Sequence, residues 1–118
     1  MIGVGIDAVD VARFSLILSR RAGFAERVFT PLERSTCVGS PNRLAARFAA
    51  KEATMKALGV GLGAFGFHDV WIEGEPSGRP VLRVAGRAAE LAATAGVRRW
   101  HVSLTHTDIM AEAVVVAE

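Results

Sequence analysis

Residues 47–59, RFAAKEATMKALG, form the most strongly helical stretch of this sequence. Alanine, lysine, glutamate and methionine dominate it, and all four are good helix formers. Upstream, Ser40 can cap a helix and Pro41 can occupy its first position, where a missing N–H costs nothing. Gly59 supplies the C-terminal stop. We therefore expect one long central helix that begins near Pro41 and ends at Gly59.

A glutamate lies on the apolar side of this expected helix. At 100° per residue, Leu44, Phe48 and Met55 fall within about 40° of one another and form the buried stripe. Glu52 lies roughly 40° from Phe48 and four residues before Lys56. Two interpretations stay open: an i,i+4 ion pair with Lys56 worth about 0.3 kcal/mol, or a ligand for a cation.

The whole-chain composition limits the class of protein. A chain of 118 residues predicts one domain spanning 1–118, and 51% apolar residues with mean hydropathy +0.32 favour burial against copies of itself. The single Cys37 excludes an internal disulfide and fits a reducing cytoplasm. Residues 1–11 lack a basic region before the apolar one, and no apolar run approaches the roughly 18 residues of a membrane span. We expect a cytoplasmic protein without a membrane segment.

Charge is unevenly distributed along the chain. Residues 1–50 contain seven arginines against four acidic residues, whereas residues 51–118 contain seven basic against eight acidic residues. The N-terminal half therefore suits an anionic partner if its arginines share one face. Tyrosine is absent, and both tryptophans fall in expected strands, so stacked nucleic-acid bases are not the expected partner.

The remaining segments predict a mixed fold. Alternation in residues 2–6 predicts a half-buried strand, Asp10 caps a helix to about residue 21, and Thr30-Pro31-Leu32-Glu33 forms a capping box before a short helix. A hairpin of 69–73 with 80–85, a helix over 87–95 and two strands at 99–105 and 110–117 follow. We expect an α+β fold, an antiparallel-rich sheet packed against the central helix. The GLGAFG of 61–66 is not a dinucleotide fingerprint, because a helix precedes it and a strand follows.

Asp7 at the end of the first strand, Glu52 and Lys56 converge if the central helix packs on that strand. Two carboxylates without a histidine or cysteine cluster favour a hard cation, Mg²⁺ rather than Zn²⁺. Because Mg²⁺ commonly completes its shell with substrate phosphates, the set suits a pyrophosphate-bearing substrate. The alternative for Asp7 is a helix cap or a solvated turn residue.

Three segments together resemble the holo-acyl-carrier-protein synthases, the short 4′-phosphopantetheinyl transferases: GIDAVDVARF, RFAAKEATMKALG and SLTHTDIMAEAVVVAE. The resemblance implies transfer of the 4′-phosphopantetheine arm of coenzyme A to a serine of apo-acyl carrier protein, with release of adenosine 3′,5′-bisphosphate. It also implies a homotrimer with active sites between subunits and a 4′-phosphopantetheinyl transferase-like fold.

The resemblance further implies roles for individual residues. Asp7 and Glu52 would hold Mg²⁺, Lys56 would stabilise the departing phosphate, and Lys51 would bind phosphate. Glu52 acting through a metal-bound water is the first choice for the base that deprotonates serine, with Asp7 or bulk water as alternatives.

Four more positions carry expectations from the same resemblance. His106 would contact the nucleotide phosphates, or is an ordinary turn histidine; Thr105 stands where the family has a second serine. Arg13, Arg20 and Arg21 would dock the acidic carrier protein, or form a solvated face. A Mg²⁺-dependent pyrophosphate hydrolase would use the same metal-binding carboxylates but water as its nucleophile, so it remains the rival enzyme.

Overall fold

The computed structural model describes all residues 1–118 as an α+β fold built from eleven elements. In chain order these are β1 (Gly3–Asp10), α1 (Val11–Arg20), α2 (Phe24–Val28), α3 (Pro31–Thr36), α4 (Pro41–Leu58), the 3₁₀ turn η1 (Phe67–Asp69), β2 (Val70–Gly74), β3 (Pro80–Val84), α5 (Gly86–Ala95), β4 (Trp100–His106) and β5 (Met110–Ala117). The expected fold class is confirmed. Only α2 and η1 were not predicted, because five-residue and three-residue helices leave too little periodicity in a sequence.

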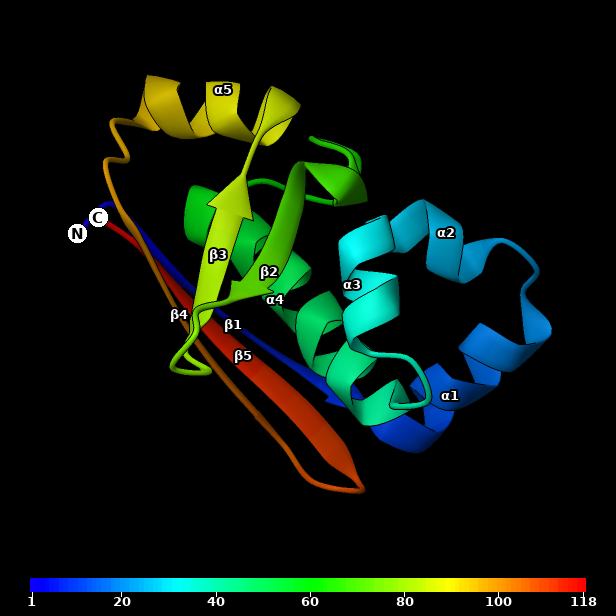
Figure 1. Cartoon of the computed structure of the whole chain (residues 1–118). Coiled ribbons are helices and arrows are strands. Elements are labelled where there is room, and N and C mark those ends of the chain that lie inside the picture. Colours follow the sequence, from blue (N-terminus) through cyan, green and yellow to red (C-terminus); the bar gives the residue numbers. More distant parts are fainter.

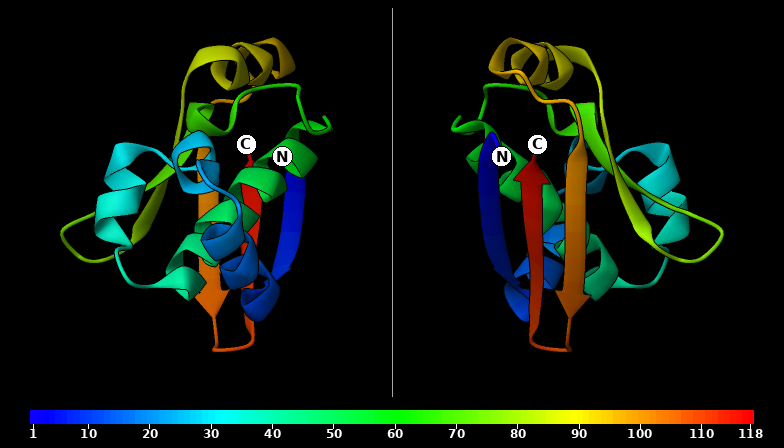
Figure 2. Two further views of the ribbon diagram at one scale, coloured as in Figure 1. Left: turned by 90° about the vertical axis from the view of Figure 1, so that its right-hand side faces the viewer. Right: turned by 90° about the vertical axis from the view of Figure 1, so that its left-hand side faces the viewer.

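The sheet is antiparallel and has two separate parts. β1, β5 and β4 form a three-stranded sheet in that order, so the first and last strands of the chain are neighbours. β2 and β3 form a separate hairpin. Helix α4 crosses one face of the three-stranded sheet, and the hairpin lies on the helix side of that sheet (Figure 1). No helix covers the opposite face, which the right-hand view of Figure 2 presents to the reader.

The central helix has the predicted ends. It runs over Pro41–Leu58, with Pro41 in its first turn and Gly59 in a left-handed conformation, φ 70°, at its C-terminus. Ser40 precedes the helix but does not cap it, because its hydroxyl contacts Asn42 Oδ1 at 2.6 Å. The helix is also buried on more sides than the predicted stripe, since five alanines are essentially inaccessible: Ala45, Ala46, Ala49, Ala50 and Ala53.

The first strand presents its glycines, not its large apolar residues, to the central helix. A Cβ added to Gly3 or Gly5 would lie 1.9 Å from the carbonyl oxygen of Ala57 or Ala53, respectively. Ile2, Val4 and Ile6 point away from α4 and remain 48%, 56% and 65% exposed. The period-2 pattern therefore predicted the strand correctly, but glycine occupies its buried face because the helix approaches so closely.

A second apolar cluster holds the N-terminal helices against α4. Phe14 of α1 packs edge-on against Phe24 and Phe29, and it also contacts Phe48 of α4 with ring centroids 5.4 Å apart. Asp10 caps α1 as predicted, because its carboxylate accepts a hydrogen bond from the Arg13 amide. This packing fixes α1 next to the end of β1.

No helix combines the length and the apolar character required to cross a membrane.

Candidate active site

Two carboxylates from neighbouring elements line one cavity. Asp7 lies within β1, not at the strand end that the sequence predicted, and is on the same side of the strand as Gly5. Glu52 lies on α4. Both line a cavity of about 520 Å³. The glycine contacts that bring β1 against α4 therefore also bring these two side chains to the same space, as the sequence predicted.

The electrostatics of this cavity show that the two carboxylates influence each other. Burial raises the pKa of Glu52, and the negative charge of Asp7 raises it further. Lys56 acts in the opposite direction, but the net pKa shift of Glu52 is upward. A pair of acids that resists full ionisation is stabilised by a cation placed between them. Asp7 and Glu52 are therefore the residues of this cavity that could hold a cation.

The donor set fits a hard divalent cation with an open coordination shell. No group of three or more histidine, cysteine or acidic residues is assembled anywhere in the chain. A closed structural Zn²⁺ site is therefore not formed by this chain, because such a site needs four protein ligands. Two carboxylates in a large open cavity instead suit Mg²⁺, which usually keeps waters and takes its remaining ligands from substrate phosphates.

Lys56 lies at the same carboxylates, but it is bonded to β1. Its ammonium donates to the Ile6 carbonyl oxygen at 2.8 Å and to Asp7 Oδ1 at 3.2 Å. The i,i+4 ion pair with Glu52, which was one of the two sequence interpretations, is absent. Lys56 therefore joins α4 to the strand that carries Asp7.

Lys51 is not brought to this site, which corrects the expectation that it binds phosphate. Its ammonium is buried, lies 2.8 Å from Glu33 Oε1, and also donates to the carbonyl oxygens of Phe67 and Val70. Burial lowers the pKa of Lys51, and the neighbouring Glu33 carboxylate opposes that shift. All its donors have partners inside the fold, so none is free for a ligand.

Glu33 completes a buried polar junction with Lys51. Its Oε1 accepts from the Thr30 amide at 3.1 Å, as the predicted capping box requires, and its Oε2 accepts from the Ile72 amide at 3.3 Å. The pair thus connects α3, α4 and the start of the β2–β3 hairpin. Sequence reasoning identified Glu33 only as a cap, because nothing local indicates a partner eighteen residues away.

His106 lies at the end of β4 and is separated from Asp7 by strand β5. Its Nδ1 is 3.2 Å from Asn42 Nδ2, next to the beginning of α4, and the imidazole is exposed. It does not line the cavity of Asp7 and Glu52. Within one subunit, His106 and the two carboxylates therefore do not form a single site.

The three predicted docking arginines are exposed and free of ion pairs. Arg13 lines the cavity, Arg20 is in the last turn of α1 and Arg21 follows it directly. None of the six ion pairs of the chain involves them. Their positive charges are therefore available to a partner at the cavity mouth and along α1.

Several residues of the site were not predicted as functional. An apolar wall faces the carboxylates and is formed by Val9, Phe14, Ile17, Phe48 and Met110. Phe48 was expected only as a core residue, and no local signal marks Met110.

Comparison with known proteins defines the class to which this fold and site belong. The family model described as the 4′-phosphopantetheinyl transferase superfamily matches residues 3–114. A holo-[acyl-carrier-protein] synthase of Frankia casuarinae is 49% identical over 118 residues, which cover 100% of this chain and 98% of the relative. The corresponding synthase of Salinispora arenicola is 50% identical over 121 residues, with the same coverage.

Solved structures give the same result. The holo-[acyl-carrier-protein] synthase of Helicobacter pylori in complex with coenzyme A superposes with a TM-score of 0.86 at 32% identity, covering 98% of this chain and 99% of that one. The Bacillus anthracis synthase in complex with coenzyme A (3′,5′-ADP) has a TM-score of 0.81 at 31% identity, covering 98% and 95%. This chain belongs to the 4′-phosphopantetheinyl transferase superfamily, and within it to the holo-[acyl-carrier-protein] synthases.

Proposed function

We propose that this enzyme transfers the 4′-phosphopantetheine arm of coenzyme A to a serine of an apo-acyl carrier protein and releases adenosine 3′,5′-bisphosphate. The observation that carries the proposal is the placement of Asp7 and Glu52 in one cavity, where the charge of Asp7 contributes to the raised pKa of Glu52. The relatives named above are holo-[acyl-carrier-protein] synthases, and two of the related structures contain coenzyme A or its nucleotide part.

Asp7 and Glu52 are the proposed Mg²⁺ ligands. The bound ion would supply charge neutralisation at the pyrophosphate during attack on phosphorus. The chain contributes the two carboxylates, held by β1 and α4, and the apolar residues that line the same cavity. Open coordination positions are needed for the co-substrate, and a site with only two acidic ligands leaves them.

Lys56 is the proposed cation for the departing phosphate, because its ammonium is at the carboxylates and its side chain is 54% exposed. The serine proton requires a base. Glu52 acting through a metal-bound water is the preferred base, while Asp7 and bulk water are the alternatives. His106 is proposed to contact the nucleotide phosphates, and its distance from the carboxylates means that it would act on coenzyme A held between two subunits.

Arg13, Arg20 and Arg21 are the proposed docking residues for the acidic carrier protein. Their lack of intramolecular partners leaves their charge available. Arg13 is nearest to the chemistry because it lines the cavity, whereas Arg20 and Arg21 extend the basic surface along α1. Such a surface steers encounter with an anionic partner and weakens with salt.

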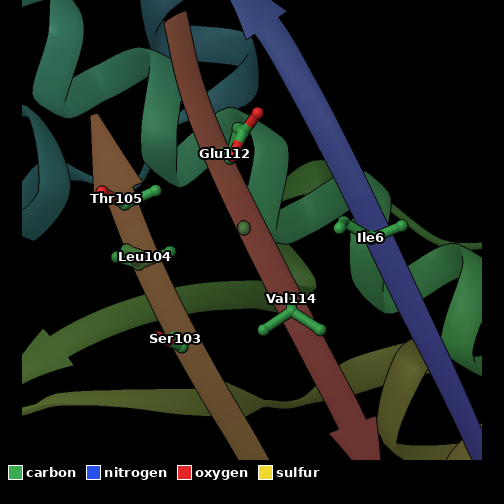
Figure 3. A pocket seen from close by; sticks show the side chains of 7 residues that line it. Ile6, Ser103, Leu104, Thr105, Glu112 and Val114 are labelled. Carbon is green, nitrogen blue, oxygen red and sulfur yellow. The ribbon is translucent and has the colours of Figure 1, made fainter. Parts of the chain in front are cut away.

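The uncovered face of the three-stranded sheet supports assembly into a homotrimer. Ile6 and Val114 pair across β1 and β5, and Val4 and Val116 form the next pair on the same face. Figure 3 shows Ile6, Val114, Ser103 and Thr105 around a shallow hollow of about 120 Å³ on this face. Val4 and Ile6 of β1 are exposed and, with the half-buried Val114 and Val116 of β5, form an apolar surface on this face. Another copy of the chain is the proposed cover.

The proposed location is the cytoplasm, and residues 1–118 are proposed to act as one transferase domain. Cys37 is a buried free thiol, and burial raises its pKa, which keeps it protonated and unreactive. A free buried thiol of this kind fits a reducing compartment such as the cytoplasm.

The direct test is a transfer assay read by mass. The protein is incubated with coenzyme A, Mg²⁺ and an apo-acyl carrier protein, and the mass of the intact carrier protein is measured by mass spectrometry. We expect the carrier to gain one phosphopantetheine group, and we expect no gain after chelation of Mg²⁺ or when the acceptor serine is replaced by alanine. Cleavage of coenzyme A while the carrier mass stays unchanged would instead identify the rival pyrophosphate hydrolase.

A further inference from the structure

Lys56 is the cation that contacts Asp7 in this structure. Its ammonium lies 3.2 Å from Asp7 Oδ1 and 2.8 Å from the Ile6 carbonyl oxygen. Asp7 lines the cavity, and its side chain is only 15% exposed. Few groups can therefore contact its carboxylate at the same time. Glu52, one helical turn before Lys56, receives no hydrogen bond from it.

From this arrangement we infer that Lys56 is the resident counter-cation of Asp7, which competes with the divalent ion and thereby makes ion binding depend on coenzyme A. The inference deepens the proposed function and rests on it. It concerns how the divalent ion and coenzyme A bind. It assigns Lys56 a role before the chemical step, in addition to its proposed role at the departing phosphate.

Electrostatic repulsion favours this competition. Two cations that share one carboxylate lie within a few ångströms of each other, and their repulsion is large in a partly buried site. Lys56 is the cation able to leave, because its side chain is 54% exposed and is carried on a flexible four-carbon stem. When Lys56 swings away, the Asp7 oxygen becomes a free ligand, and the neutral Ile6 carbonyl loses only one hydrogen bond.

A pyrophosphate provides the new partner that Lys56 needs. An ammonium with three donors binds phosphate oxygens readily as a point charge. The divalent ion alone therefore has to displace Lys56 into water, whereas the ion with coenzyme A displaces it onto phosphate. We expect weak binding of the ion alone and strong positive coupling with coenzyme A, which must be equal in both directions.

The first test measures affinity for Mg²⁺ by calorimetry, with and without coenzyme A, for the wild type, Lys56→Met and Lys56→Gln. We expect both variants to bind Mg²⁺ alone about 3-fold to 10-fold more tightly than the wild type, since the competitor is gone. Coenzyme A should then strengthen Mg²⁺ binding less in the variants than in the wild type. Arg87→Met on α5 is the matched control, because it removes one exposed positive charge that is paired with Glu90 and lies outside the cavity.

The second test observes Lys56 directly. The chain contains only two lysines, Lys51 and Lys56, so specific labelling of lysine with ¹³C at Cε gives two NMR signals. Mg²⁺ should shift the signal of Lys56, and coenzyme A should shift it again. The signal of Lys51 should not move, because its ammonium is fixed in the interior.

Different results would overturn the counter-cation role of Lys56 and the proposed metal site. Unchanged or weaker Mg²⁺ affinity in both Lys56 variants, or an unmoved Lys56 signal at saturating Mg²⁺, would overturn the counter-cation role while the wild type still modifies its carrier. A wild type that binds no divalent ion, with or without coenzyme A, would overturn the metal site and this inference together. Thermal unfolding of each variant establishes that the folded protein is being compared.

Discussion

Gly5 of β1 lies so close to α4 that a Cβ at this position would be 1.9 Å from the carbonyl oxygen of Ala53. Ala53 is the residue directly after Glu52, and Asp7 is two residues after Gly5, on the same side of the strand. The contact between a glycine and a helix backbone therefore sets the distance between the two acidic side chains of the site.

Gly5→Ala should separate β1 from α4, because neither backbone can move aside within its own element. Overpacking of this kind costs about 1–3 kcal/mol of unfolding free energy. Transfer activity should fall by more than the folded fraction falls, since Asp7 and Glu52 move apart. Urea unfolding and activity at low temperature measure the two effects. Gly74→Ala is the control, because no atom lies within 4 Å of its added Cβ.

Glu52→Gln should reduce transfer by at least about 100-fold, since loss of one charged group that stabilises a transition state commonly costs that much. Asp7→Asn should act similarly. Steady-state assays at saturating Mg²⁺ measure the loss, and circular dichroism establishes that the fold is retained. Normal turnover by Glu52→Gln would remove this residue from the mechanism.

The same variant gives a prediction about pH. The pKa of Glu52 is raised in the folded protein, so its ionised form is less stable there than in the unfolded chain. This destabilisation is absent well below the ordinary value of 4.5 and grows as pH rises through the folded pKa. Without a divalent ion, Glu52→Gln should therefore unfold at a temperature equal to or above that of the wild type at pH 7. A gap that is the same at pH 4 and pH 7 would contradict the raised pKa.

Lys51→Met should destabilise the protein by about 3–5 kcal/mol, because Glu33 is left as a buried charge without a cation. The double variant Glu33→Gln with Lys51→Met should recover part of this loss. A glutamine still offers its one oxygen to the amide of Thr30 or to that of Ile72, and no net charge remains buried. Urea midpoints measure both. A Lys51→Met protein of wild-type stability that binds coenzyme A poorly would restore Lys51 as a phosphate ligand.

Arg13→Glu should raise the apparent KM for the carrier protein by about 10-fold and leave that for coenzyme A nearly unchanged. Reversal of one charge at a docking surface acts mainly on encounter, and the effect should shrink between 0.1 and 1 M salt, as the Debye length falls from about 10 to 3 Å. Arg20→Glu and Arg21→Glu should give smaller changes in the same direction. Equal changes for both substrates would argue against docking at α1.

Val4→Glu tests the proposed assembly. Val4 is 56% exposed on the uncovered sheet face and is three residues from Asp7. A carboxylate there should prevent contact between copies, so light scattering should report a smaller species than the wild type. Transfer should fall as well if coenzyme A lies between subunits. A variant that keeps the mass of the wild type would show that this face is not the interface.

Much of this molecule could be predicted from local patterns. The ends of α4, the N-cap of Asp10, the capping box of Thr30, the hairpin and the two final strands all depend on residues that are close in the chain. Backbone conformation and capping are short-range effects, so these elements are encoded where they occur. The likeness of three motifs to one enzyme family also required no coordinates.

Other features depended on contacts between distant residues. Lys51 and Lys56 belong to one motif and one helix, yet Lys51 is bonded to Glu33 in the interior and Lys56 to Asp7 of β1. Their different partners are 18 and 49 positions away in the sequence, beyond the reach of any local pattern. In the same way, the sequence determined that β1 alternates, but only the close approach of α4 decided that glycine faces inward and isoleucine outward. Secondary structure follows from neighbours along the chain, whereas the partner of a buried charge and the exposed face of a strand follow from what packs against them.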